Sequence, residues 1–402
     1  MKHAALLALL MLLCLSLSGC GGGQEIESCL FALSMAVDPA PDGNLTVTIK
    51  ALSGTQEAES AVSGSSSSAG SSDEQGDSKN EQSKPSGAET PEPGYIVLSA
   101  TAGSCLRALN LLSSTTPRTV NLSQLREIVI NETLARTDAT LSILKQIYSM
   151  YRANGEAIVV ITPNDAGDFI RRQRAILGVR LSRYLEVLFD HFSQMDTIPP
   201  NAQLSAVIAA MESTTTDAAA VYAAGNAFDS TLVLSGASDT DRLPGHLPRT
   251  SPAENEYLGC ALFDGPRMTG TLTGEETGVL CLMMGKAQRQ TTFIGDTQYK
   301  SNMPSLVRRR INREDGSLCI EIAMSLTRIA GEGGELPGEI SAQIETSCAN
   351  VLLKLKAAGC DAAGFGRIAV RAYPDIPAWE RSGWKQRYET APIRIRVRAK
   401  VL

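Results

Sequence analysis

The chain has 402 residues, of which 43% are hydrophobic, and a formal net charge of −6. This length is sufficient for two or three domains. Most of the negative charge falls in residues 51–93, where eight acidic residues stand against two lysines. The remainder is nearly neutral, which argues against nucleic acid as a partner. No stretch after residue 20 has the length and apolarity of a membrane span, which predicts a soluble ectodomain.

The first twenty residues have the order of a bacterial lipoprotein signal. Residues 4–15 form an unbroken apolar run, too short for a permanent membrane helix but typical of a secretory signal core. Leu17-Ser18-Gly19-Cys20 follows, with small residues beside a thiol that can receive diacylglycerol. We therefore expect a signal peptide at 1–19 and a lipid anchor and tether at 20–27, with the covalent lipid on Cys20. The alternative is an ordinary secretory signal with an incidental cysteine.

Seven cysteines remain after the signal and the anchor, an odd number with no Cys-x-x-Cys pair. They are Cys29, Cys105, Cys260, Cys281, Cys319, Cys348 and Cys360. Most stand in apolar patterns, which predicts small buried hydrophobic side chains, while pairing of some as disulfides stays open. Only His191 and His246 accompany them in the mature chain, so we expect no metal site.

The N-terminal region, 28–200, is predicted to be a layered α/β domain. A half-buried hairpin is expected at Leu30–Val37 and Leu45–Lys50, followed by a disordered Ser/Gly/Glu-rich insertion at 51–93. Strand and helix patterns then alternate. The expected strands are Tyr95–Leu98, Leu125–Ile130 and Ala157–Ile161, and the expected helices are Cys105–Leu112, Asp138–Ala153 and Leu177–Phe192.

A middle domain is predicted at 201–305. The Ala-rich stretch 198–226 is predicted to be helical, Ser230–Leu234 to be a strand, and the Pro-rich stretch 238–256 to be a linker. A second hairpin is expected at Tyr257–Phe263 and Met268–Leu272, followed by a helix at 274–284.

The C-terminal region, 306–402, is predicted to be another α/β domain. Its two-faced strand Leu318–Thr327 and amphipathic helix Ile340–Ala358 are expected to pack together. Gly364-Phe365-Gly366 lacks the third glycine of a phosphate loop and is interpreted as a tight helix junction. The chain as a whole is therefore expected to be α+β, with two to three dissimilar domains that each carry a mixed sheet with packed helices.

Two C-terminal features are candidate interaction surfaces. Trp379 and Trp384 stand five residues apart in a helix-like stretch, where one is expected in the core and the other at a protein interface. The last strand places Arg394, Arg396 and Arg398 on one face, together with Lys400. Such a basic stripe suits anionic lipid headgroups or an acidic partner, and the alternative is a solvated sheet face.

Catalytic patterns are missing from the sequence. It contains no Gly-x-Ser-x-Gly elbow, no His-Glu-x-x-His and no phosphate loop, and its two mature histidines stand far apart. We therefore expect no enzyme, no catalytic residue and no cofactor apart from the covalent lipid.

Several segments resemble one family in order and spacing. Gly259-Cys260-Ala261-Leu262-Phe263-Asp264-Gly265, then Gly285-Lys286, and later Ala358 to Arg367 with Tyr373-Pro374 are similar to the C-subunit lipoproteins of spore germination receptors, the Ger(x)C family. The N-terminal half agrees more loosely, through Glu132-Thr133-Leu134-Ala135 among others, and many relatives have histidine where Gln124 stands. The resemblance covers nearly the whole mature chain except the Ser-rich insertion.

The resemblance implies a non-catalytic subunit of a nutrient germinant receptor. Such a subunit is anchored by lipid at the extracytoplasmic face of the spore inner membrane and acts as a scaffold or coupling element beside membrane subunits A and B. One alternative is the solute-binding lipoprotein of a transporter, which predicts two similar lobes around a cleft. Another is a lytic wall enzyme, which predicts a carboxylate pair or metal site in a groove.

Overall fold

The computed structural model describes ten ranges of the chain. They are residues 28–53, 94–150, 153–226, 243–247, 254–288, 291–294, 297–301, 305–312, 314–331 and 336–402. The expected signal peptide 1–19, the anchor at Cys20 and the expected strand Ser230–Leu234 lie outside these residues. So do most of the expected linker 238–256 and all but the first three residues of the expected insertion 51–93.

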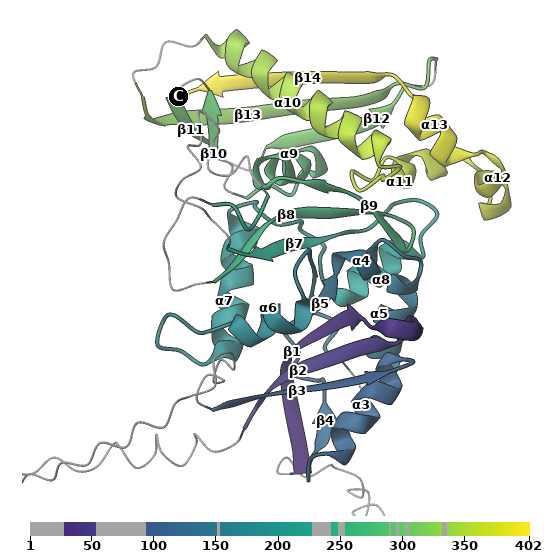
Figure 1. Cartoon of the computed structure of the whole chain (residues 1–402). Coiled ribbons are helices and arrows are strands. Elements are labelled where there is room, and N and C mark those ends of the chain that lie inside the picture. The colour runs from purple at the N-terminus through teal and green to yellow at the C-terminus, as the bar shows by residue number, and fades with distance from the viewer. Residues whose placement is uncertain are drawn as a thin grey trace, which may run out of the picture.

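A nine-stranded mixed sheet contains the described strands up to residue 272 (Figure 1). Its spatial order is β3-β2-β1-β5-β6-β7-β8-β9, with β4 paired to the start of β1. Neighbours from β1 to β7 are parallel, and antiparallel strands flank them on both sides. The strands are β1 Cys29–Pro39, β2 Leu45–Leu52, β3 Tyr95–Ala102, β4 Thr119–Asn121, β5 Glu127–Asn131, β6 Ile158–Thr162, β7 Ala219–Gly225, β8 Asn255–Asp264 and β9 Arg267–Leu272.

The first hairpin forms as predicted, but it is more deeply buried than its alternating pattern indicates. A short helical turn at Pro41–Gly43 joins β1 to β2, and the two strands pair antiparallel. β1 also pairs with β5, so it lies inside the sheet and is buried on both faces. Thr48 and Lys50, on the face expected to meet solvent, are buried as well. The prediction of a half-buried hairpin was wrong because helices cover both faces of this sheet.

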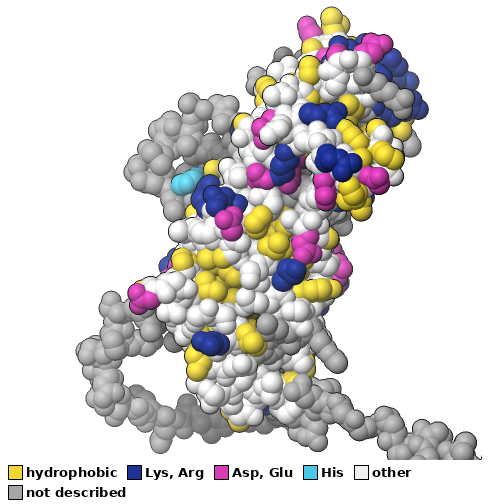
Figure 2. Space-filling model, turned by 90° about the vertical axis from the view of Figure 1, so that its right-hand side faces the viewer, with side chains coloured by type: hydrophobic (Ala, Val, Ile, Leu, Met, Phe, Trp, Pro, Cys, Tyr) yellow, Lys and Arg dark blue, Asp and Glu magenta, His cyan; other side chains and the backbone are white. Residues whose placement is uncertain are grey.

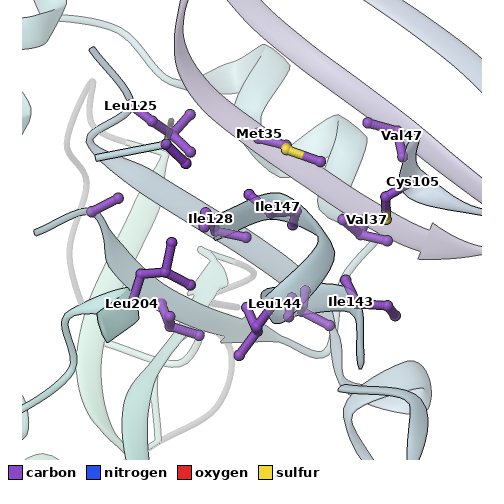
Figure 3. Packing of buried hydrophobic residues seen from close by; sticks show 14 of the residues in the cluster. Met35, Val37, Val47, Cys105, Leu125, Ile128, Ile143, Leu144, Ile147 and Leu204 are labelled. Atoms are coloured by element: carbon purple, nitrogen blue, oxygen red, sulfur yellow. The ribbon is translucent and has the colours of Figure 1, made fainter. Parts of the chain in front are cut away.

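Helices pack on both faces of the first sheet. On one face α3 (Cys105–Ser114), α4 (Glu132–Ala135), α5 (Ala139–Met150) and α8 (Leu204–Met211) close the largest core. Figure 3 shows Ile143 and Ile147 of α5 near Val37 of β1 and Ile128 of β5. On the other face α6 (Ala166–Arg172) and α7 (Leu181–Gln194) cover a separate core that includes Leu33 and Val160.

Two helix predictions in this region need correction. The helix expected from Leu177 begins only at Leu181, because Gly178 adopts a positive φ of 43° and Leu177 is 69% exposed. The Ala-rich stretch 198–226 contains a short helix and then strand β7. This strand is buried between β6 and β8, so pairing on both edges overrides the helix propensity of its alanines.

A second sheet of five strands forms the C-terminal part (Figure 1). β13 pairs with β12 along its first half, with β11 near its end, and with β14 in parallel. The predicted two-faced strand and its helix α10 (Pro337–Ala357) are confirmed, since both supply the second core. The strands are β10 Thr291–Ile294, β11 Thr297–Ser301, β12 Leu306–Ile311, β13 Leu318–Ala330 and β14 Ile393–Val401.

Strand β8 of the first sheet contributes side chains to two cores. Ala261 and Phe263 of β8 belong to the first large core, whereas Cys260 and Leu262 belong to the second. The second core also contains residues of α9 (Gly274–Met284), α11 (Gly366–Ala369), α12 (Ile376–Arg381) and α13 (Trp384–Thr390). The first sheet therefore continues across the expected domain limit at residue 200, and its last strands form the base on which the C-terminal part is built.

The cysteines have the environment predicted for small hydrophobic side chains. All seven that follow the anchor are buried and carry free thiols. Burial raises the pKa of the Cys105 and Cys348 thiols to about 12. These two thiols therefore keep their protons near neutral pH.

Candidate interaction surface

The two tryptophans lie inside the protein. Trp379 is 2% exposed and Trp384 is 8% exposed, and their ring centroids are 5.6 Å apart. The positive φ of Gly383, 61°, turns the chain between α12 and α13, so rings five residues apart meet in the second core. Trp379 donates its indole N–H to the Thr214 hydroxyl at 3.1 Å. Neither ring is available to a partner, so the prediction that one of them is an interface contact was wrong.

Two buried carboxylates connect this region to the first sheet. Asp361 accepts the backbone N–H groups of Phe365 (2.9 Å) and Gly366 (2.6 Å) at the start of α11. Its own N–H donates to Asp217, which precedes β7, at 2.8 Å. Lys385 of α13 forms ion pairs with Asp217 and with Asp264 at the end of β8. Burial raises the pKa of Asp361 to about 7, against the opposing effect of the two N–H donors.

The raised pKa predicts a pH-dependent stability that Asp361→Asn removes. The folded chain holds a proton on Asp361 between about pH 4 and pH 7, where the unfolded chain has lost it. Stability is therefore expected to fall by up to about 4 kcal/mol as pH rises across this window. Urea denaturation at intervals of pH measures the slope. The exposed Asp42→Asn is the matched control and should keep the wild-type slope, and an unchanged slope in Asp361→Asn would contradict the assignment.

The arginines of the last strand are exposed as predicted. Along β14, Arg394, Arg396 and Arg398 alternate with Ile393, Ile395 and Val397, which face the second core. The register across β13 aligns Glu321 with both Arg396 of β14 and Arg308 of β12. The basic stripe therefore continues over the sheet. We call this surface the basic face, and it comprises Lys300, Arg308, Arg310, Arg394, Arg396, Arg398 and Lys400.

Sequence reasoning missed the β12 side of the basic face. From Val307 to Ile311 the sequence alternates apolar and basic residues except at Arg309, and this alternation is a strand signal. Arg309 points inward, where it donates to the carbonyl of Ala363. A strand prediction at 306–311 would have placed Arg308 and Arg310 together on one side.

The free edge of β14 is occupied by helix α10. The Val397 N–H donates to the Glu345 carboxylate at 2.7 Å, and the Ala399 N–H donates to the Ser341 hydroxyl at 3.1 Å. These bonds satisfy edge groups that could otherwise pair with a strand of another chain. A partner of this sheet therefore meets the side chains of the basic face rather than the backbone of β14.

The best-defined pocket lies elsewhere, between α7 and β8. It has a volume of about 400 Å³ and is lined mainly by apolar side chains, among them Leu185, Phe192 and Leu258. Gln173 and Tyr257 also line it, and both hydrogen-bond to the buried Glu127. The pocket lies against one face of the first sheet and not between two similar lobes.

The described residues contain neither a metal-ion site nor a membrane-spanning helix. No group of three His, Cys, Asp or Glu side chains there is placed to hold a metal ion. Within the same residues, no helix combines the length and apolarity that crossing a membrane requires.

Two family models match the chain. The model described as Spore germination protein N-terminal domain matches residues 22–224, and the model described as Spore germination B3/ GerAC like, C-terminal matches residues 258–402. The chain belongs to the GerAC-like family of spore germination proteins. This is the family of germination receptor C subunits, which confirms the resemblance inferred from the sequence.

Other comparisons add little to the family assignment of this GerAC-like chain. One solved structure, "Crystal Structure of the GerBC protein", is similar over 92% of this chain and 96% of its own, with 12% sequence identity and a TM-score of 0.45. No curated protein matches the chain.

Proposed function

We propose that this chain is the lipid-anchored C subunit of a nutrient germinant receptor. It is held at the extracytoplasmic face of the spore inner membrane by diacylglycerol on Cys20, and it acts beside subunits A and B as a non-catalytic scaffold or coupling element. The observation that carries the proposal is the match of both family models, over residues 22–224 and 258–402. The lipid is inferred from the Leu17-Ser18-Gly19-Cys20 sequence.

The solute-binding alternative has less support. It predicts two similar lobes around a cleft, whereas the described residues form a nine-stranded sheet and a five-stranded sheet of different topology. The pocket between α7 and β8 belongs to the first of these alone. A scaffold needs extended surfaces and rigid joints. Strand β8, which contributes to two cores, and the contacts of Asp217, Asp361 and Lys385 provide such a joint.

The anchoring is tested by Cys20→Ala in the source organism. We expect this variant to leave the spore membrane fraction, and nutrient-triggered germination to fall to the level of the deletion strain, because the lipid is the membrane attachment in this proposal. Membrane fractionation, mass spectrometry of the N-terminus and germination rate are the measurements.

Cys14→Ala is the matched control, since Cys14 lies in the segment expected to be removed with the signal. It should behave as the wild type, and germination by a non-nutrient trigger should be normal in every strain. Normal nutrient germination in the deletion strain would overturn the function, and an unmodified Cys20 thiol in the wild type would overturn the anchor.

A further inference from the structure

We infer that the basic face binds an acidic segment of a partner protein, and not the surface of a lipid bilayer. The inference deepens the proposed function, since it names the chemistry of a partner contact for the receptor subunit. It is carried by the charges, the side-chain sizes and the position of this one surface.

The basic face has one sign of charge. Seven basic side chains from β11, β12 and β14 share it with one acidic side chain, Glu321 of β13, which pairs with Arg310 at 3.0 Å. Arg394 pairs with Asp315 in the turn before β13. In the described part of the chain, no carboxylate lies within ion-pairing distance of Arg308, Arg396, Arg398 or Lys400.

Figure 2 shows Lys and Arg side chains gathered near the top of the molecule, in the part that contains the second sheet. A cluster of like charges destabilises itself at close range, and an acidic partner relieves that repulsion.

The central row of the basic face, on β13, consists of short side chains except at Glu321. Along β13, Cys319, Glu321, Ala323 and Ser325 point to this side. The register places Cys319 between Arg310 and Arg394, Glu321 between Arg308 and Arg396, and Ala323 between Leu306 and Arg398. Neighbouring strands are spaced by about 4.8 Å, so the two basic rows lie roughly 10 Å apart. This width suits an extended segment or a helix whose acidic side chains reach both rows. A flat bilayer surface would touch the long basic side chains and leave the central row uncovered.

The position of the basic face also separates it from the anchoring membrane. In Figure 1 the start of β1, which follows the expected tether, lies at the bottom of the molecule, and the second sheet lies at the top. The segment from Cys20 to the first described residue, Ser28, is short. If the lipid is on Cys20, as proposed above, the basic face is directed away from that membrane and toward other proteins.

The test places a photocrosslinking amino acid at Ala323, an exposed residue of the central row, in the full-length protein in spores. We expect a crosslink to a protein segment rich in Asp and Glu, identified by mass spectrometry. The double variant Arg396→Glu with Arg398→Glu should lower the crosslink yield roughly tenfold. Replacing the mapped acidic residues of the partner by lysine should restore the yield with this double variant.

Two controls accompany the test. Arg371→Glu with Arg381→Glu makes the same change of charge on exposed residues away from the basic face, and it should leave the yield unchanged. The crosslinker at Leu353, which is 54% exposed on α10, should not capture the same segment. Equal thermal unfolding midpoints of all variants exclude misfolding as the cause of a lost crosslink.

Three results would each overturn the inference: a crosslink to lipid in place of protein, a protein crosslink that survives the charge reversal, or no crosslink from Ala323. These results are independent of the anchoring test. If the deletion strain germinates normally with nutrients while the wild-type protein shows the charge-dependent crosslink, the proposed function fails and the acidic partner stands.

Discussion

Gly366→Ala is expected to lower the free energy of unfolding by about 3 kcal/mol, one of the two largest effects of a single substitution that we expect in this chain. A Cβ atom at Gly366 would lie 2.5 Å from the carbonyl oxygen of Thr215 and 2.7 Å from the indole nitrogen of Trp384. The first of these is backbone and cannot rotate away. The loss would be read from urea denaturation of the full chain.

The effect has a structural reason beyond local crowding. Thr215 lies in the segment between α8 and β7, which belongs to the first sheet, whereas Gly366 opens α11 in the C-terminal part. At Gly366 the backbones of the two parts therefore lie too close together to admit a side chain. The added methyl would push them apart and weaken the bonds that Asp361 makes to Phe365 and to Gly366 itself.

Gly338→Ala is the matched control. Gly338 lies in the first turn of α10 with no atom within 4 Å of the added Cβ, so alanine there should be neutral or stabilise by about 0.5–1 kcal/mol. Equal stabilities of the two variants would show that the junction tolerates a side chain at Gly366. The structure would then be wrong about this contact.

The sequence predicted the elements in which the pattern of apolar and polar residues matches the pattern of burial. The alternation along β13 and β14 and the stripe on α10 identified both faces of the second sheet, because these strands have one buried and one exposed face. The helix junction at Gly364-Phe365-Gly366 was also predicted, and α11 begins there. In each case the structure depends on residues close in sequence, or only on whether a side chain faces the core or the solvent.

The missed features depend on residues far apart in the chain. Strand β7 was predicted to be helical because alanine does not favour strands. It forms a strand because it pairs with β6 on one side and β8 on the other. One of Trp379 and Trp384 was expected at an interface, because nothing near them in sequence shows that α12 and α13 turn inward at Gly383. Only half of the basic face was predicted. The arginines of β14 are evident from the alternation of that strand, whereas those of β12 lie beside them only because both strands pair with β13.

The deepest polar cluster in the first sheet could not be predicted for the same reason. Lys50 of β2, Ser34 of β1 and Glu127 of β5 are adjacent across three strands, and all are essentially inaccessible. Gln173 connects them: its side chain accepts from Ser34 at 2.9 Å and donates to Glu127, and its carbonyl accepts from the Lys50 ammonium. Tyr257 of β8 donates to Glu127 at 3.1 Å. The alternation of β2 alone indicated a solvent-facing lysine.

Glu127→Gln is expected to destabilise the chain by about 3 kcal/mol, because it removes the charge that balances the buried Lys50. Lys50→Met should cost a similar amount by leaving Glu127 without its cation. The double variant should lose clearly less than the sum of the two, with a coupling of about 2 kcal/mol in a double-mutant cycle. The exposed pair Lys145 and Glu212, 2.6 Å apart, is the matched control, and its cycle should give less than about 1 kcal/mol.

The pH dependence separates the charge effect from loss of packing. Burial raises the pKa of Glu127, and Lys50 opposes that rise. A carboxyl with a raised pKa in the folded state keeps its proton after the unfolded chain has lost it, so stability falls as pH rises above the usual range of glutamate. Without Lys50 the pKa rises further, and Lys50→Met should therefore continue to lose stability to a higher pH than the wild type does. Glu127→Gln has no carboxyl to titrate and should be flatter than both. Parallel slopes in the three proteins would mean that Lys50 acts through its packing alone and that the two charges do not interact across β1.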